Sequence, residues 1–162
     1  MSSLFDPAAR DAIHARVDRL AAEQAPHWGR MDAHRMVCHV SDLLRVALGD
    51  IESHPRPIGF RFGAREVKTS PGLLRFRWYR ALIVHRTPWP KARVLAPPEF
   101  FTTTPAVWRD DVAALHALID RVGDKDPADD WAAHPWYGPV SGREWGLLCW
   151  EHTDYHLRQF GA

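Results

Sequence analysis

The sequence predicts an all-α protein, a four-helix bundle with one long crossover between its second and third helices. Three observations predict this fold class. Four segments carry apolar residues at helical spacing, each of them opens on a residue that caps helices, and more than fifty residues with seven of the thirteen prolines separate the second segment from the third. Because 162 residues suit one hydrophobic core, a single domain over residues 1–162 is expected.

The first two helices are predicted over residues 6–24 and 32–48. The first opens on Asp6, a capping residue, with proline at the first helical position. The second is followed by Gly49, where a C-terminal glycine is expected. The apolar stripes that predict them are Ile13, Val17, Leu20 and Ala21 in the first and Met36, Val40, Leu43 and Ala47 in the second.

The third helix is predicted to begin at Thr104-Pro105 and to stop at Gly123. The fourth has the clearest start, because Ser141 and Glu144 have the spacing of a capping box. It is expected to end just before Gly161. The stripes are Trp108, Val112, Leu115, Ile119 and Val122 in the third and Trp145, Leu148, His152, Tyr155, His156 and Gln159 in the fourth.

The long connection is strongly basic, although the whole chain has a formal net charge of +1. Residues 53–93 hold ten basic residues and one acidic residue, and residues 73–85 within them predict a short helix. We expect this basic segment to lie against acidic helix faces or in solvent, and a docking surface for an anion is the second interpretation. A pI of about 7.9 and the lack of a recognition motif argue against nucleic-acid binding.

Three of the ten histidines form the candidate metal site. His152 and His156 are four residues apart, so both imidazoles lie on one helix face and can reach a common ion. They share that face with Trp145 and Leu148, which places the rings toward the core. His39, beside the apolar stripe of the second helix, is the candidate third ligand, because facing helices of a bundle supply ligands that project inward.

A plainer interpretation stays open, since histidines on an apolar face are more often hydrogen-bonded core residues. Other ligand sets are weaker. His34 and Cys38 are four residues apart but lack a third group, and Cys149 lies about 10 Å along the helix axis from His156. The residue after His152 is not the glutamate that a zincin motif requires.

No apolar run approaches the ~20 residues that span a bilayer, and the N-terminus lacks the basic start and apolar stretch of a signal peptide. A cytoplasmic protein with no membrane partner is therefore expected. The two cysteines, Cys38 and Cys149, are interpreted as reduced and buried, because two thiols do not make a disulfide framework.

Four stretches of the sequence resemble one protein family. They are Met-Val-Cys-His-Val-Ser-Asp-Leu-Leu, His-Pro-Trp-Tyr-Gly, Ser-Gly-Arg-Glu-Trp-Gly and Glu-His-Thr-Asp-Tyr-His-Leu-Arg-Gln-Phe-Gly. With these motifs the chain is similar to the DinB-like superfamily of four-helix metalloproteins, and to a branch described as a domain of unknown function. The resemblance covers nearly the whole chain and is weakest in the basic segment.

The resemblance implies an up-down-down-up bundle, a homodimer, and one divalent ion, often zinc or nickel, held by His39, His152 and His156. Some members of the superfamily are transferases or isomerases that use a low-molecular-weight thiol, and many have no assigned reaction. The resemblance therefore implies a metal more strongly than it implies any reaction.

Two kinds of chemistry fit three neutral histidines, because such a site leaves one position on the ion open. A water there suits a metal-dependent hydrolase, and a thiol there suits a thiol-dependent transferase acting on a small molecule. Arg75, Arg77 and Arg80 are candidates to hold the carboxylates of such a thiol. Tyr155 and Gln159 lie near the histidine face, and each is a candidate to support a ligand, to contact a substrate or to pack. A non-enzymatic binding or scaffolding protein is the alternative, because no acid–base residue is clearly placed beside the ligands.

Overall fold

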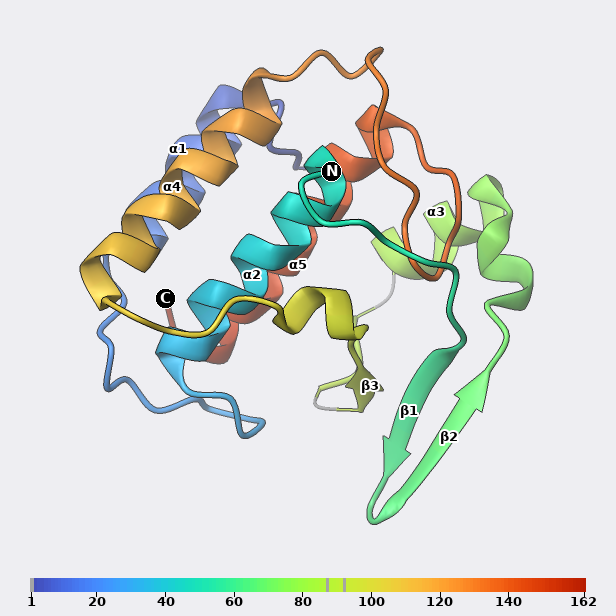
Figure 1. Cartoon of the computed structure of the whole chain (residues 1–162), viewed down its shortest axis with the longest axis horizontal. Coiled ribbons are helices and arrows are strands. Elements are labelled where there is room, and N and C mark those ends of the chain that lie inside the picture. The colour runs from blue at the N-terminus through green and yellow to red at the C-terminus, as the bar shows by residue number, and fades with distance from the viewer. Residues whose placement is uncertain (1, 87, 92) are drawn as a thin grey trace.

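Four helices form the larger part of the molecule. The computed structural model describes residues 2–86, 88–91 and 93–162. The four helices are α1 (Pro7–Val17), α2 (Ala33–Leu48), α4 (Trp108–Asp124) and α5 (Gly142–Gln159). Both α1 and α2 contact α4 and α5. In Figure 1, α4 is seen in front of α1, and α2 in front of α5. The helices that carry the three candidate ligands, α2 and α5, therefore lie against each other.

The hydrophobic core lies between these helices, and α2 runs through its centre. Twelve of the sixteen residues of α2 are buried, among them the polar residues His39, Ser41 and Asp42. Buried polar groups require hydrogen-bond partners, so each of these three constrains what packs around it. Among the described residues, no helix combines the length and the apolar character needed to cross a membrane.

The predicted ends of α2 and α5 are confirmed. The Asp32 carboxylate accepts a 2.7 Å hydrogen bond from the amide of Arg35, and Gly49 closes α2 with a φ of +84°. Ser141 and Glu144 form the predicted capping box at the start of α5. Because these caps fix where each helix begins, they also fix which of its residues face the core.

The first predicted helix is too long. Asp6 caps α1 as expected, with its side chain accepting from the amide of Ala8, but α1 ends at Val17 and not near Gln24. The chain turns there and nevertheless keeps Leu20 in the core. The apolar period of the first segment therefore extends beyond the helix itself.

The third predicted helix begins later than expected, because α4 starts at Trp108 and residues 104–107 stay outside it. The Asp111 carboxylate accepts a 2.9 Å hydrogen bond from the amide of Ala106, which holds the preceding segment away from the helical path. Gly123 does not stop the helix but lies in its last turn. A Cβ there would collide with the backbone of the N-terminal segment.

The prediction of an all-α fold is wrong, because the connection between α2 and α4 contains a three-stranded antiparallel sheet. Strand β1 (Ile58–Phe62) pairs with β2 (Arg65–Thr69) on one edge and with β3 (Val94–Leu95) on the other. Every second residue of β1 is apolar, which favours a strand, and Gly63 with a φ of +61° makes the tight turn of the hairpin. A short helix, η2 (Pro98–Phe101), follows β3.

The helix predicted over residues 73–85 appears as two pieces, η1 (Gly72–Arg75) and α3 (Arg77–Arg86). Arg80 of α3 is 2% exposed, and its guanidinium donates to the Glu144 carboxylate at 2.6 and 3.0 Å. This buried ion pair anchors α3 to the start of α5. The basic segment thus does contact an acidic residue of a core helix, as one of the two expectations had it.

Candidate metal centre

Three histidine side chains gather between α2 and α5. His39 comes from α2, and His152 and His156 come from successive turns of α5. Their ring centroids lie 4.7 to 4.9 Å apart, and Nε2 of His39 lies 3.0 Å from Nε2 of His152. All three side chains are buried, and one ligand atom from each lies within 4.8 Å of the others. The residues that the sequence singles out therefore form a group that could hold a metal ion.

The orientation of His39 is set by the backbone of η2. Its Nδ1 lies 2.9 Å from the carbonyl oxygen of Phe100. Because a carbonyl oxygen only accepts, Nδ1 carries the proton, and Nε2 of the neutral ring keeps its lone pair on the side that faces His152. Such a hydrogen bond on the remote ring nitrogen is the usual support of a histidine that binds metal.

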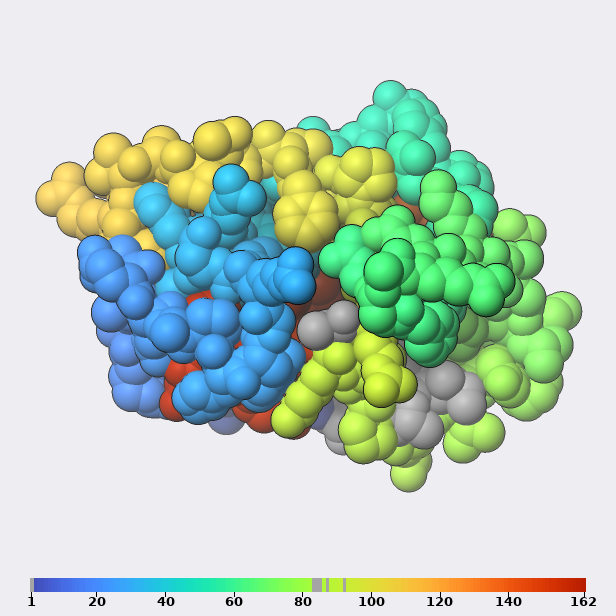
Figure 2. Space-filling view, turned by 90° about the horizontal axis from the view of Figure 1, so that it is seen from below, coloured from blue at the N-terminus to red at the C-terminus, as the bar shows by residue number. Residues whose placement is uncertain are grey.

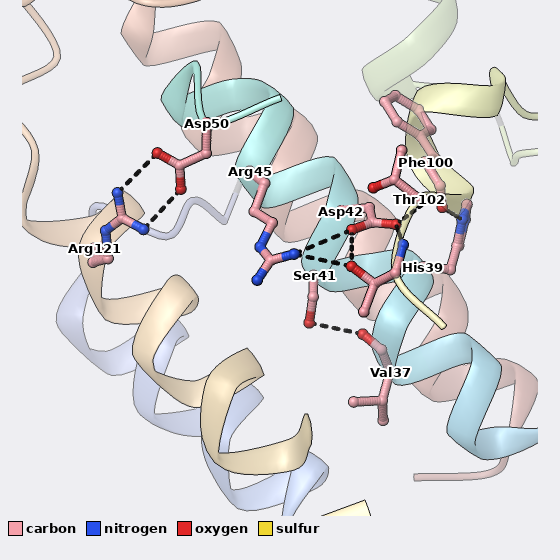
Figure 3. Close-up of polar contacts among 10 residues, drawn as sticks. Val37, His39, Ser41, Asp42, Arg45, Asp50, Phe100, Thr102 and Arg121 are labelled. Carbon is pink, nitrogen blue, oxygen red and sulfur yellow. Dashed lines mark hydrogen bonds and ion pairs between the residues drawn. The ribbon is translucent and has the colours of Figure 1, made fainter. Parts of the chain in front are cut away.

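The carbonyl of Phe100 is itself held in place by Asp42, which is fully buried one turn beyond His39 on α2. The Asp42 carboxylate accepts from the amides of Thr102 and Thr103 at 2.7 and 2.8 Å. Figure 3 shows Asp42 and His39 reaching the same short segment from one face of α2. Asp42 thus positions the group that orients His39, without belonging to the histidine group.

His156 is oriented by Gln159. Its Nδ1 lies 2.8 Å from Oε1 of Gln159, and Nε2 of the same amide donates to the carbonyl oxygen of Trp28 at 2.7 Å. The Trp28 carbonyl can only accept, so the amide nitrogen must face it and Oε1 must face His156. The proton of His156 is therefore on Nδ1, which leaves the lone pair on Nε2.

Burial keeps the three imidazoles neutral. It lowers the pKa of His39 to about 4 and that of His156 to about 3. The pKa of His152 is also lowered well below its usual value, first by burial and then by the two neighbouring histidines. Neutral imidazole is the form that binds metal ions. The donor set, the two bare Nε2 atoms of His39 and His156 with the His152 imidazole beside them, fits a divalent metal ion.

The histidines form part of the wall of a large cavity of about 990 Å³. In Figure 2 its mouth lies between residues 28–35, η2 and the β1–β2 hairpin, and α5 shows in red at its base. The wall is mostly apolar, and Phe101 stacks on His39 with 4.6 Å between ring centroids. A small molecule in this cavity has a direct path to the three histidines.

Candidate acid–base groups around the histidines are few. Within the described part of the chain, Asp32 is the one carboxylate that lines the cavity, and its side chain is 61% exposed at the mouth. Tyr155 lines the cavity, and its hydroxyl accepts from the indole nitrogen of Trp28 at 3.4 Å. Of the two polar residues predicted near the histidine face, Gln159 forms a hydrogen bond with His156, and the Tyr155 ring packs against His156 with 5.1 Å between centroids.

A second group with metal-binding side chains lies between α2 and α4. The sequence pairs His34 with Cys38, and the structure adds Asp111, whose Oδ2 lies 2.6 Å from Nε2 of His34. Burial, helped by the charges of Asp111 and Asp42, raises the pKa of the Cys38 thiol to about 11. A thiol that keeps its proton is a poor ligand. We interpret this group as a hydrogen-bonded link between two helices.

The arginines predicted to hold the carboxylates of a thiol do not gather at the histidines. Arg80 is bound to Glu144, and none of Arg75, Arg77 and Arg80 lines the cavity. Arg77 lies instead at a separate pocket of about 410 Å³ beside the start of α5. The structure therefore gives no support to that placement, since the arginines that line the cavity are Arg30, Arg35 and Arg61.

The other cysteine and histidine residues considered as ligands lie where they have structural roles. Cys149 is buried, and burial raises the pKa of its thiol. His134 accepts from two amides of its own turn and stacks on Tyr137 at 4.2 Å, which is the turn role that the sequence indicates. His14 and His116, for which the sequence indicates no partner, stack on each other between α1 and α4.

Comparison of the chain with protein-family models, with curated proteins and with solved structures found no match. The function is therefore inferred from the sequence and from the geometry of the site.

Proposed function

We propose that this protein binds one divalent metal ion, zinc or nickel, through Nε2 of His39, His152 and His156. The observation that carries the proposal is the pair of fixed tautomers. Phe100 and Gln159 accept the Nδ1 protons of His39 and His156, so two bare Nε2 atoms are held inside the apolar wall together with the third ring.

An ordinary packing role explains these rings less well. A buried imidazole nitrogen without a partner is costly, and a core histidine usually meets a hydrogen-bonding group of another kind. Here Nε2 of His39 meets Nε2 of His152 at 3.0 Å, and that contact joins only two of the three rings. A divalent ion accepts all three lone pairs at once.

The same proposal includes membership of the DinB-like superfamily and the homodimer that the resemblance implies, both of which rest on the quoted motifs. A cytoplasmic location rests on the sequence expectation. When bound, the ion would supply Lewis-acid chemistry, polarising a water, a thiol or a substrate oxygen in the open position. The chain itself would orient the ligands through Phe100 and Gln159 and exclude bulk water with the aromatic wall.

Both a metal-dependent enzyme and a non-enzymatic binding protein are compatible with this site. The enzyme, a hydrolase or a thiol-dependent transferase, is supported by the cavity that reaches the histidines. The non-enzymatic alternative is supported by the scarcity of acid–base groups, because Asp32, the one lining carboxylate among the described residues, is near Arg35 at the exposed mouth. The number of protein ligands on the bound ion distinguishes the two, since a fourth one would close the site.

The test is the metal content of tag-free protein, measured by elemental mass spectrometry. We expect about one equivalent of zinc or nickel in the parent and almost none in a His152→Ala, His156→Ala variant. A His27→Ala, His54→Ala variant removes two exposed histidines outside the cavity and should keep the metal. Circular dichroism checks that each variant is folded. A parent that takes up no metal even after reconstitution with zinc and with nickel would refute the proposal.

A further inference from the structure

The cavity beside the histidines has a strongly aromatic wall. Trp28, Phe60, Trp89, Phe101 and Trp136 all line it, and they come from segments far apart in the sequence. Its volume of about 990 Å³ lies at the upper end of the range of small-molecule sites. A ligand that fills this space must present a mostly apolar body to the wall, and rings suit flat aromatic neighbours best.

The charged residues of the lining are unbalanced. Among the residues that the structure describes, the cavity is lined by Arg30, Arg35 and Arg61 together with a single acid, Asp32. Arg61 is paired with Glu66 at 2.6 Å, and Arg35 lies 3.8 Å from Asp32. Within the described part of the chain, Arg30 makes no ion pair or hydrogen bond through its side chain. The mouth therefore holds one guanidinium without a counter-charge.

Arg30 belongs to a segment that is fixed next to the histidines. The carbonyl of Trp28 accepts from Gln159, the residue that orients His156. Gly29 has a φ of +82°, and a Cβ there would come within 2.7 Å of the Gln159 amide nitrogen. Because the backbone of residues 28–29 lies this close to α5, the following Arg30 is held at the rim on the side of the histidine group.

We propose that the cavity binds a small organic anion with an apolar, ring-bearing body. The body would lie along the aromatic wall toward the histidines, and the acidic group, a carboxylate or a sulfonate, would pair with Arg30 at the mouth. This inference deepens the proposed function, because it names the class of molecule that would reach the proposed metal. A guanidinium suits such a group, since it can donate two parallel hydrogen bonds to its oxygens.

A cationic ligand fits the same cavity poorly. Aromatic walls attract cations, but here a cation of the protein already uses one ring, because Nζ of Lys91 lies 4.3 Å from the centroid of Trp28. Arg30, whose charge is not balanced by an acid, would repel a second cation. A neutral apolar ligand would pack against the wall but leave Arg30 without a partner. Anionic and neutral ligands can therefore be distinguished by their affinities.

Two fluorescent probes make that separation. 8-Anilinonaphthalene-1-sulfonate and N-phenyl-1-naphthylamine have the same rings, and only the first carries a sulfonate. Each is titrated into the parent, into Arg30→Gln, and into Arg109→Gln, which removes a 90% exposed arginine on α4 outside the cavity. We expect the parent to bind about one anionic probe, roughly fivefold more tightly than the neutral one. Arg30→Gln should remove most of this preference, and Arg109→Gln should leave it unchanged.

Two further measurements locate the probe. Trp78 is 67% exposed on α3 outside the cavity, so Trp78→Gln should leave binding unchanged. Metal-free parent protein should keep the anion preference, because the preference depends on the rim and not on a metal. The inference would be overturned if the parent bound the two probes with equal affinity. It would also be overturned if Arg109→Gln lost as much of the anion preference as Arg30→Gln, or if Trp78→Gln lost binding. None of these results would alter the metal content, so the two proposals can fail separately.

Discussion

The structure selects one role for Gln159, which from the sequence could support a ligand, contact a substrate or pack. Its amide makes two hydrogen bonds of fixed direction, accepting from His156 and donating to the carbonyl of Trp28. The two bonds cannot be exchanged, because the Trp28 carbonyl has no proton to give. One amide therefore selects the tautomer of a proposed ligand and also fixes the segment that carries Arg30.

Replacing Gln159 should weaken metal binding without unfolding the protein. In Gln159→Leu, His156 loses its Nδ1 acceptor, and we expect zinc affinity to fall by about 10- to 100-fold, measured by competition with a chromophoric chelator. Gln159→Glu keeps an acceptor for His156 and should lose less. Equal losses in the two variants would show that the effect comes from packing, and an unchanged affinity in Gln159→Leu would remove its proposed role.

The candidate ligands could be predicted from the sequence, whereas their supports could be predicted only in part. The spacing of His152 and His156 on a capped helix with Trp145 and Leu148 is enough to place both rings inside. Gln159 lies on the same face, but nothing in the sequence says that its second bond goes to Trp28, which is 131 residues away. Phe100 contributes its backbone carbonyl to the hydrogen bond with His39. Every residue has such a carbonyl, so the sequence does not show which residue provides it.

At the scale of the elements, two carboxylates hold the segment between η2 and α4 against α2. Asp42 of α2 binds the amides of Thr102 and Thr103, and Asp111 of α4 binds the amide of Ala106. The Asp111 carboxylate also forms a 2.6 Å hydrogen bond with Nε2 of His34 on α2. This bracing holds the segment outside α4, which explains both the late start of α4 and the fixed position of the Phe100 carbonyl.

The free energy of unfolding of the protein should depend on the charge of Asp111. Its pKa is lowered, first by the hydrogen bond from Ala106 and also by His34, against the opposing effect of burial. A depressed carboxyl pKa stabilises the fold above the unfolded-state pKa of about 3.9, and the effect is lost as pH falls through the folded-state pKa. Asp111→Asn keeps the acceptor without the charge, so it should cost about 1 kcal/mol at pH 7.

Urea denaturation of the parent and of Asp111→Asn, each at pH 7, 5 and 3, measures this difference. The difference in the free energy of unfolding between the parent and Asp111→Asn should be nearly the same at pH 7 and 5 and should become smaller at pH 3. Arg109→Gln, which changes an exposed charge on the same helix, serves as the control and should differ little from the parent at any of the three values. A gap that persists undiminished at pH 3 would mean that shape, and not charge, causes it.

Elements that carry their own local signal were predicted well, and those that depend on distant contacts were not. The capping box of α5 and Gly49 of α2 are local, and both ends are found where the sequence places them. The start of α4 depends on Asp111 reaching back to Ala106, and Val107 at its cap offers no side-chain bond. The β1–β2 hairpin was missed because its two-residue apolar period is short and lies in a proline-rich connection interpreted as a crossover.

At the scale of the whole molecule, the proposed ion would join the central helix to the last one. α2 contacts α4, α5 and η2, so a bond between His39 and the two α5 histidines would tie together elements from both halves of the chain. Anything that binds the folded state and not the unfolded one stabilises the fold by RT ln(1 + [L]/Kd). Metal binding and resistance to unfolding should therefore change together.

Thermal unfolding of metal-free protein, with and without added zinc, tests this coupling. At a free zinc concentration of about 100 times Kd the stabilisation is about 2.7 kcal/mol, which for a chain of this size raises Tm by roughly 5–10 °C. The His152→Ala, His156→Ala variant should show almost no rise, and the His27→Ala, His54→Ala variant should show the full one. An equal rise in both variants would place the stabilising zinc elsewhere, with the His34, Cys38 and Asp111 group the first place to look.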